Sequence, residues 1–243
     1  AAGDPYTVAA SRLPAASSIM MLAAHVSRHR IFTEWLDPSI SDESQPNLRD
    51  AQLNLYDAGN PNQPPYSADF LERFAQAQVA RNRRITAWVK EKLAVIRSSD
   101  SPWSEFAFTV HGTMADPRWL DPSIEPSDRK AGSCYLGDPQ IVNDGPVGLA
   151  RFCTLRSWLS QWSYDDARCD AIASGSRISV PVLVIGNSAD DACTPSHTQR
   201  LYDAVTHEQK HLHVVKGATH YYTGANGAEH MAEACGVIEK FLA

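Results

Sequence analysis

The C-terminal part of the chain alternates short apolar runs with helical patterns, and this order restricts the fold more than any other feature. The runs VPVLVIG at 180–186 and HLHVV at 211–215 are typical of short strands that are buried on both faces. The segment 194–208 between them predicts a helix, because Thr194 can cap it and Pro195 can occupy its first turn. Strand, helix and strand in this order predict a parallel sheet with helices on its faces.

Two further segments extend this α/β pattern. The run SIMMLAA at 18–24 predicts another buried strand, and the segment 228–243 has apolar residues at the three- and four-residue spacing of an amphipathic helix. In parallel sheets, functional residues gather at the carboxyl ends of the strands. His25, the loop NSADDACTP at 187–195 and His220 all follow predicted strands at such ends.

The long stretch between the first and second strands has a different character. Turn-forming residues are frequent in 37–67, and Ser67 then predicts the start of a long helix over 68–98. A further helical piece is predicted at 148–163. A mostly helical insertion between two sheet strands indicates a lid over a pocket. We therefore divide the chain into a core strand with its connection (1–30), a mostly helical cap (31–175) and a C-terminal core (176–243).

Charge and composition exclude several kinds of partner. The net charge is -6, and no basic cluster is denser than ARNRR at 80–84, so neither nucleic acid nor anionic lipid is an expected partner. The apolar run 19–24 is far too short to span a membrane. The five cysteines show no zinc-ligand spacing, and we predict no metal and no cofactor. The compartment stays undecided, with the cytoplasm slightly favoured.

The two C-terminal loops carry a carboxylate and then a histidine. Asp190 and Asp191 follow the strand 180–186, and His220 follows the strand 211–215. A carboxylate that accepts a hydrogen bond from one ring nitrogen fixes the histidine tautomer, so that the other nitrogen can take a proton. Either aspartate is able to orient His220 in this way.

At this point the sequence resembles a known family. The segment 180–243 resembles the C-terminal part of the α/β-hydrolase fold, in which strand-G-loop-D-x-x-x-P-helix supplies the acid and strand-x-G-x-x-H supplies the base. On this resemblance Asp191, four residues before Pro195, is the acid and His220 is the base. Asp190 is the alternative acid, because the loop is longer than the common form. The resemblance implies the C-terminal half of a hydrolase sheet with a large cap insertion.

The nucleophile of that family is missing from the sequence. It belongs to a G-x-S-x-G turn that precedes the acid, and no such motif occurs in these 243 residues. Ser188 lies inside the acid loop itself, and no buried strand precedes Cys134. Ser17 and Ser18 open a strand and do not follow one. None of these residues is a convincing nucleophile.

The order of elements in the family accounts for this absence. We predict that the nucleophile and the oxyanion hole belong to a partner polypeptide, the N-terminal half, which would cover the open edge of the first strand. This half is either cleaved from the same precursor or separately encoded. The protein is then a heterodimer with a processed chain, and the 243-residue chain alone is expected to be inactive.

The predicted activity is hydrolysis of a carboxylic ester, lactone or amide through a Ser-His-Asp triad. The substrate is expected to be a small apolar or aromatic molecule, with Tyr221 and His25 at the pocket. Trp158 and Trp162, spaced i and i+4, are interpreted first as packing residues and second as substrate contacts. Alternatives are the related C–C hydrolase, epoxide hydrolase and hydroxynitrile lyase chemistries, or a non-catalytic binding subunit that retains these residues as relics.

Overall fold

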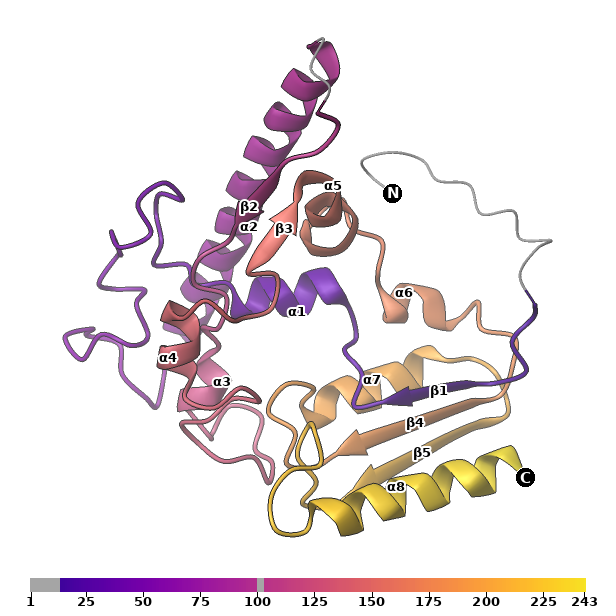
Figure 1. Ribbon diagram of the computed structural model, residues 1–243. Coiled ribbons are helices and arrows are strands. Elements are labelled where there is room, and N and C mark those ends of the chain that lie inside the picture. Colours follow the sequence, from indigo (N-terminus) through magenta and orange to yellow (C-terminus); the bar gives the residue numbers. More distant parts are fainter. Residues whose placement is uncertain (1–13, 100–102) are drawn as a thin grey trace. The chain divides into compact units, whose positions relative to one another are not determined.

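The structure, a computed structural model, describes residues 14–99 and 103–243. The chain has a mixed α/β fold with two compact units (Figure 1). The first, here called the sheet unit, contains the described residues 14–27, 122–136 and 170–243. The second, here called the helical unit, contains the described residues 28–99, 103–121 and 137–169.

A three-stranded parallel sheet forms the centre of the sheet unit. Its strands are β1 (Ile19–Leu22), β4 (Val182–Asn187) and β5 (Lys210–Val215), in the order β1-β4-β5. The register is continuous across the sheet, since Val184 lies opposite Met21 on one side and Leu212 on the other. The parallel sheet predicted from the apolar runs is confirmed.

Helices pack on this sheet as the alternation of side chains requires. Leu183 and Ile185 of β4 pack in one cluster with Ala234 of α8 (Gly227–Leu242). The opposite face of β4 lies against α7 (Pro195–Ala204), where Gly186 meets Thr198. The short helix α6 (Ala171–Gly175) also contacts α7. Consecutive strand residues point to opposite faces, so β4 is covered on both sides.

Burial differs between the strands, and the prediction of burial on both faces is correct for β4 but wrong for β1 and β5. All six residues of β4 are buried, as expected for a central strand. In β1, however, Met20 is 38% and Leu22 is 40% exposed. In β5, Leu212 and Val214 are also exposed. Both are outer strands of the described sheet, with β4 as their one strand partner, so their side chains receive less cover.

The helical unit is organised around the long helix α2 (Ala68–Ser98). Ser67 caps it as predicted, because its hydroxyl accepts a hydrogen bond from the Phe70 amide. The buried face of α2 includes Phe74, Ile85 and Val89, and it packs against α1 (Arg28–Trp35). None of the described helices is long and apolar enough to cross a bilayer.

The remaining elements of the helical unit are short. The predicted helix over 148–163 is instead the strand β3 (Phe152–Thr154), the helical turn α5 (Leu155–Ser157) and the π-helix η2 (Trp158–Trp162). β3 pairs with β2 (Ala107–Thr109) in an antiparallel ribbon, a contact between distant segments that local periodicity does not reveal. The helices α3 (Pro117–Leu120) and α4 (Pro139–Asp144) each begin with a proline behind an aspartate cap.

Residues 122–136 lie with the sheet unit, although the predicted cap boundary of 31–175 includes them. The contacts explain this placement. Glu125 accepts a hydrogen bond from the Ser196 amide at the start of α7. Asp128 accepts one from the Ser188 hydroxyl in the loop after β4, at 2.6 Å. This segment therefore forms part of the surroundings of the C-terminal loops.

Replacing glycine by alanine is expected to change the stability in opposite directions at two positions of the sheet unit. A Cβ atom at Gly186 would lie 2.3 Å from Thr198 Oγ1, whereas one at Gly236 in α8 would meet nothing within 4 Å. We expect Gly186→Ala to lower the free energy of unfolding by about 1–3 kcal/mol through overpacking. Gly236→Ala should raise it by up to about 1 kcal/mol, since alanine favours the helix. Urea denaturation of both variants measures this difference, and equal effects would contradict the packing of α7 on β4.

Burial of Cys153 predicts a pH-dependent stability. Its thiol donates a hydrogen bond to the Ala150 carbonyl in the core of the helical unit, and burial raises its pKa from 9.0 to about 12. Above about pH 9 the unfolded thiol loses its proton while the folded thiol keeps it, so this group lowers the free energy of unfolding as pH rises. The stability difference between wild type and Cys153→Ala should therefore shrink by roughly 1 kcal/mol between about pH 7 and pH 10. If urea denaturation gives the same stability difference at both pH values, the folded protein does not keep the Cys153 thiol protonated.

Candidate active site

His220 and Asp190 meet at the carboxyl edge of the parallel sheet. Asp190 lies in the loop after β4, and His220 lies in the loop after β5, the neighbouring strand. The ring Nδ1 of His220 is 3.0 Å from Asp190 Oδ2 and 3.2 Å from Oδ1. The Asp190 side chain is completely buried, and the His220 side chain is 16% exposed. The pair thus joins an enclosed carboxylate to an imidazole that solvent can reach.

The Asp190 carboxylate is held in place by its own loop. Its Oδ1 accepts hydrogen bonds from the backbone amides of Ala192, at 2.8 Å, and Cys193, at 2.7 Å. Two amide donors compensate a buried negative charge and fix the direction of the carboxylate. The loop therefore presents a rigid acceptor to His220.

This geometry sets the chemistry available to His220. Because a carboxylate accepts at Nδ1, the neutral imidazole carries its proton there and Nε2 is left as an acceptor. Within the described ranges, both hydrogen bonds of His220 go to Asp190. An imidazole held in one tautomer, with a charged group behind it, is suited to take and return a proton.

Of the two aspartates named in the sequence analysis, Asp190 is the one hydrogen-bonded to His220. The motif spacing, in contrast, favoured Asp191. Asp191 is half-buried, and its pKa is raised to about 6 by burial and then by the neighbouring charge of Asp190. Asp190 forms a common turn, in which its carboxylate accepts from the amides two and three residues later, but two adjacent aspartates give no sequence signal for which of them forms it.

Aromatic side chains surround the His220 ring. The ring centroid of Tyr221 is 4.6 Å from that of His220, and the ring of Tyr135 lies at 5.7 Å. The two tyrosine rings are 6.0 Å apart. Tyr221 was a predicted pocket residue and is 56% exposed. Tyr135 was missed, because nothing in its local sequence connects the segment 122–136 with the histidine loop.

His25 also lies at this edge of the sheet. It follows β1, and its ring centroid is 6.3 Å from that of His220. Its Nδ1 is 3.1 Å from the sulfur of Cys193, in the same loop as Asp190. The structure thus brings together His25, Tyr221 and His220, three of the residues selected from the sequence.

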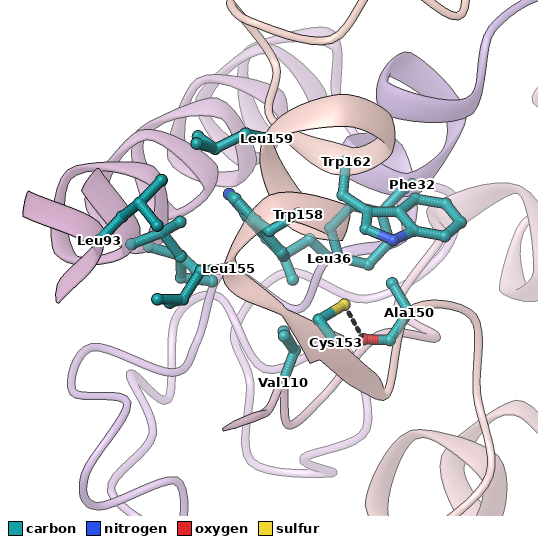
Figure 2. Close-up of a cluster of buried hydrophobic side chains, with 12 residues drawn as sticks. Phe32, Leu36, Leu93, Val110, Ala150, Cys153, Leu155, Trp158, Leu159 and Trp162 are labelled. Carbon is teal, nitrogen blue, oxygen red and sulfur yellow. Dashed lines mark hydrogen bonds between the residues drawn. The ribbon is translucent and has the colours of Figure 1, made fainter. Parts of the chain in front are cut away.

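The two tryptophans selected from the sequence lie elsewhere, in the helical unit. Trp158 is 0% and Trp162 is 7% exposed, and both belong to a buried hydrophobic cluster. Figure 2 shows their rings among the side chains of Phe32, Leu36 and other core residues. This burial fits the packing role that was placed first. It does not support the substrate contact suggested for Trp158, because its side chain is completely enclosed.

Ser188, in the loop after β4, connects neighbouring segments of the sheet unit by hydrogen bonds. Ser188 donates to Asp128 and accepts a hydrogen bond of 2.7 Å from the Gly217 amide. These two bonds connect the loop after β4 to the segment 122–136 and to the loop after β5. The Ser188 hydroxyl is thus engaged by Asp128 and Gly217 and not by His220. Cys134 is buried, at 3% exposure.

The fold and the site define a mixed α/β protein with a carboxylate–histidine pair at the carboxyl edge of a parallel sheet. No model of a protein family matches the sequence, and no curated protein matches it. A similarity is found to the crystal structure of Paleococcus ferrophilus monoacylglycerol lipase, with 19% identity and a TM-score of 0.32. It covers 62% of this chain and 51% of the lipase chain, so the chain spans about half the length of that lipase. A likeness this weak carries no argument about activity.

Proposed function

We propose that the protein is a serine-type hydrolase of a carboxylic ester, lactone or amide, in which His220 is the general base. The observation that carries this proposal is the hydrogen bonding of His220 Nδ1 to the buried Asp190 carboxylate. Asp190 orients the ring and stabilises the imidazolium that forms during proton transfer. In this assignment Asp190 replaces Asp191 as the orienting acid.

The proposed reaction has two stages. A serine hydroxyl, or a cysteine thiol in its place, attacks the substrate carbonyl while His220 Nε2 takes its proton. His220 returns that proton to the leaving alcohol or amine, and an acyl-enzyme remains. Water then attacks the acyl group with His220 again as the base, which releases the acid and restores the nucleophile. Amide donors near the nucleophile stabilise the oxyanion.

The nucleophile and the oxyanion donors are proposed to come from a polypeptide outside these 243 residues, the N-terminal half of the enzyme. The open side of β1 supports this arrangement. Among the described residues β1 has one strand partner, β4, and its side chains Met20 and Leu22 are about two-fifths exposed. A strand added at this edge would pair with the β1 backbone, and elements packed on the same face could cover both side chains.

The surroundings of His220 support an apolar or aromatic substrate group. Tyr135 and Tyr221 place two aromatic rings within 6 Å of the imidazole, and Tyr221 is exposed. Such rings offer large apolar surfaces for an aryl or alkyl group of an ester. Replacement of Tyr221 by alanine should raise the KM for an aryl ester more than that for a short alkyl ester.

Intact masses test the two-polypeptide part of this proposal. The native protein, isolated from its source through a tag on this chain, should contain a second polypeptide that copurifies with aryl ester hydrolysis. When this complex is treated with a fluorophosphonate, a reagent that reacts with activated serines, the label should be found on the second polypeptide. A single 26.7 kDa species that hydrolyses the ester as fast as the protein isolated from its source would contradict the partner assignment.

The other chemistries of related hydrolases use the same pair and remain alternatives. They separate by substrate, since an epoxide hydrolase or a C–C hydrolase would act on its own substrate faster than on an aryl ester. A non-catalytic subunit is distinguished differently. In that case no ester hydrolysis would copurify with the chain, and the His220→Ala variant would bind the same partner without any kinetic effect.

A further inference from the structure

A second group of side chains lies beside the catalytic pair in the sheet unit. It comprises His25 after β1, Cys193 in the loop after β4 and His197 in the first turn of α7. One donor atom of each residue lies within 4.8 Å of the donor atoms of the other two. The closest pair, His25 Nδ1 and Cys193 Sγ, is 3.1 Å apart.

The chemistry of these donors fits a thiophilic divalent ion. Zinc in proteins is bound by thiolate sulfur at about 2.3 Å and imidazole nitrogen at about 2.0–2.1 Å, in tetrahedral geometry. Those lengths place neighbouring ligand atoms roughly 3.3–3.6 Å apart. The donor atoms here all lie within 4.8 Å of one another, so shifts of about 1 Å bring them to this geometry. Hard ions such as Mg²⁺ prefer oxygen ligands and fit this set poorly.

The burial of these three residues favours a specific metal site over loose binding of an ion at the surface. Cys193 and His197 are each 1% exposed, and His25 is half-buried. The three residues come from three different elements that the parallel sheet brings to one edge. Sequence spacing did not reveal them, because 168 positions separate His25 from Cys193.

We propose that His25, Cys193 and His197 form a binding site for one zinc ion, an assignment that goes beyond the hydrolytic function. On binding, the Cys193 thiol loses its proton to solvent and its sulfur forms a bond to Zn²⁺. Two neutral imidazoles donate lone pairs to the ion. The fourth tetrahedral position is left for water or for an incoming ligand.

The site shares a residue with the surroundings of the catalytic pair. Cys193, Asp190 and His220 also have donor atoms within 4.8 Å of one another. The Cys193 amide, in addition, donates to the Asp190 carboxylate that orients His220. A zinc ion bound to Cys193 would therefore lie next to His220. Its bond to the sulfur would also shift the loop whose amides hold the Asp190 carboxylate. We expect zinc to inhibit the hydrolysis and a chelator to restore it.

Cobalt binding tests the site without any substrate. Titration of the full 243-residue chain with Co²⁺ should produce a thiolate-to-cobalt charge-transfer band that saturates at one equivalent and disappears on addition of Zn²⁺. The Cys193→Ser variant should lose this band. His25→Gln should weaken binding by at least about tenfold while keeping the thiolate band at high cobalt, because the sulfur ligand remains.

Matched controls separate the site from other metal-binding groups. Cys235→Ser removes an exposed thiol of the same unit, and His213→Gln removes a histidine paired with Glu233 at 2.7 Å. Both variants should bind Co²⁺ as the wild type does. A wild type without the band, a band that survives in Cys193→Ser, or one that vanishes in Cys235→Ser would overturn the proposal. Circular dichroism verifies folding, and His25→Gln decides the question if Cys193→Ser does not fold. Because no ester is used, failure here leaves the hydrolase assignment untouched.

Discussion

Replacing His220 by alanine is expected to lower aryl ester hydrolysis by about a thousandfold or more in the assembled enzyme, meaning this chain with its nucleophile-bearing polypeptide. The reason is that no other group then accepts the proton of the attacking hydroxyl. The His220 side chain is only 16% exposed and packs against Tyr221 and Tyr135, so circular dichroism must verify that the variant keeps the wild-type fold. An activity within about threefold of the wild type would contradict the role of His220.

The acid is tested by a companion pair of variants. Asp190→Asn keeps the size of the side chain but replaces the acceptor at His220 Nδ1 by an amide, which favours the wrong tautomer and is expected to lower kcat by up to about 10⁴-fold. Asp191→Asn should cost much less. His211→Ala, an exposed histidine of β5, serves as the control. The reverse ranking of the two asparagine variants would return the orienting role to Asp191.

Replacing Trp158 by alanine is expected to lower the free energy of unfolding by about 3–5 kcal/mol. Its side chain is completely buried in the cluster of Figure 2, and its ring lies edge to face with Phe32 at 5.5 Å. The indole N–H also donates to the Thr86 hydroxyl at 2.9 Å. Alanine leaves a cavity in the core of the helical unit and removes this hydrogen bond, while the Thr86 hydroxyl keeps its bonds to Asn82 and Ser163.

Two variants make this prediction specific. Trp158→Phe fills most of the cavity and loses only the hydrogen bond, so we expect a smaller cost of about 1–3 kcal/mol. Trp103→Ala removes a tryptophan that is 73% exposed and should change stability by less than about 0.5 kcal/mol. Urea denaturation followed by circular dichroism measures all three. A cost below about 1 kcal/mol for Trp158→Ala would show that this cluster is not the core of its unit.

The sequence predicts best those elements whose patterns are local. The run 180–186 contains most of the central strand β4, and α7 begins at Pro195 as expected. Thr194 occupies the N-cap position, but its side chain makes no capping hydrogen bond, contrary to the prediction. The exposure of Met20 was not predictable, because it depends on what lies at the edge of the sheet. The pairing of β2 with β3 was also missed, since each strand has only three residues and the partner is distant in sequence.

The residues of the candidate site also differ in whether a local sequence pattern predicts them. His220 follows from its place after a strand, which is a local signal. The hydrogen bonding of Asp190 to His220 and to the loop amides depends on the loop conformation, whereas the spacing to Pro195 favoured Asp191. Tyr135 and the His25–Cys193 contact depend on long-range packing. One sequence without its relatives holds no signal for such contacts.

Covalent labelling tests most directly whether His220 activates a nucleophile on another polypeptide. The assembled enzyme is treated with a fluorophosphonate, and the labelled peptide is identified by mass spectrometry. We expect one labelled serine outside these 243 residues in the wild type, and at least about a thousandfold slower labelling in His220→Ala. Equal labelling rates in the two proteins, or a label on a serine of this chain, would contradict the shared triad.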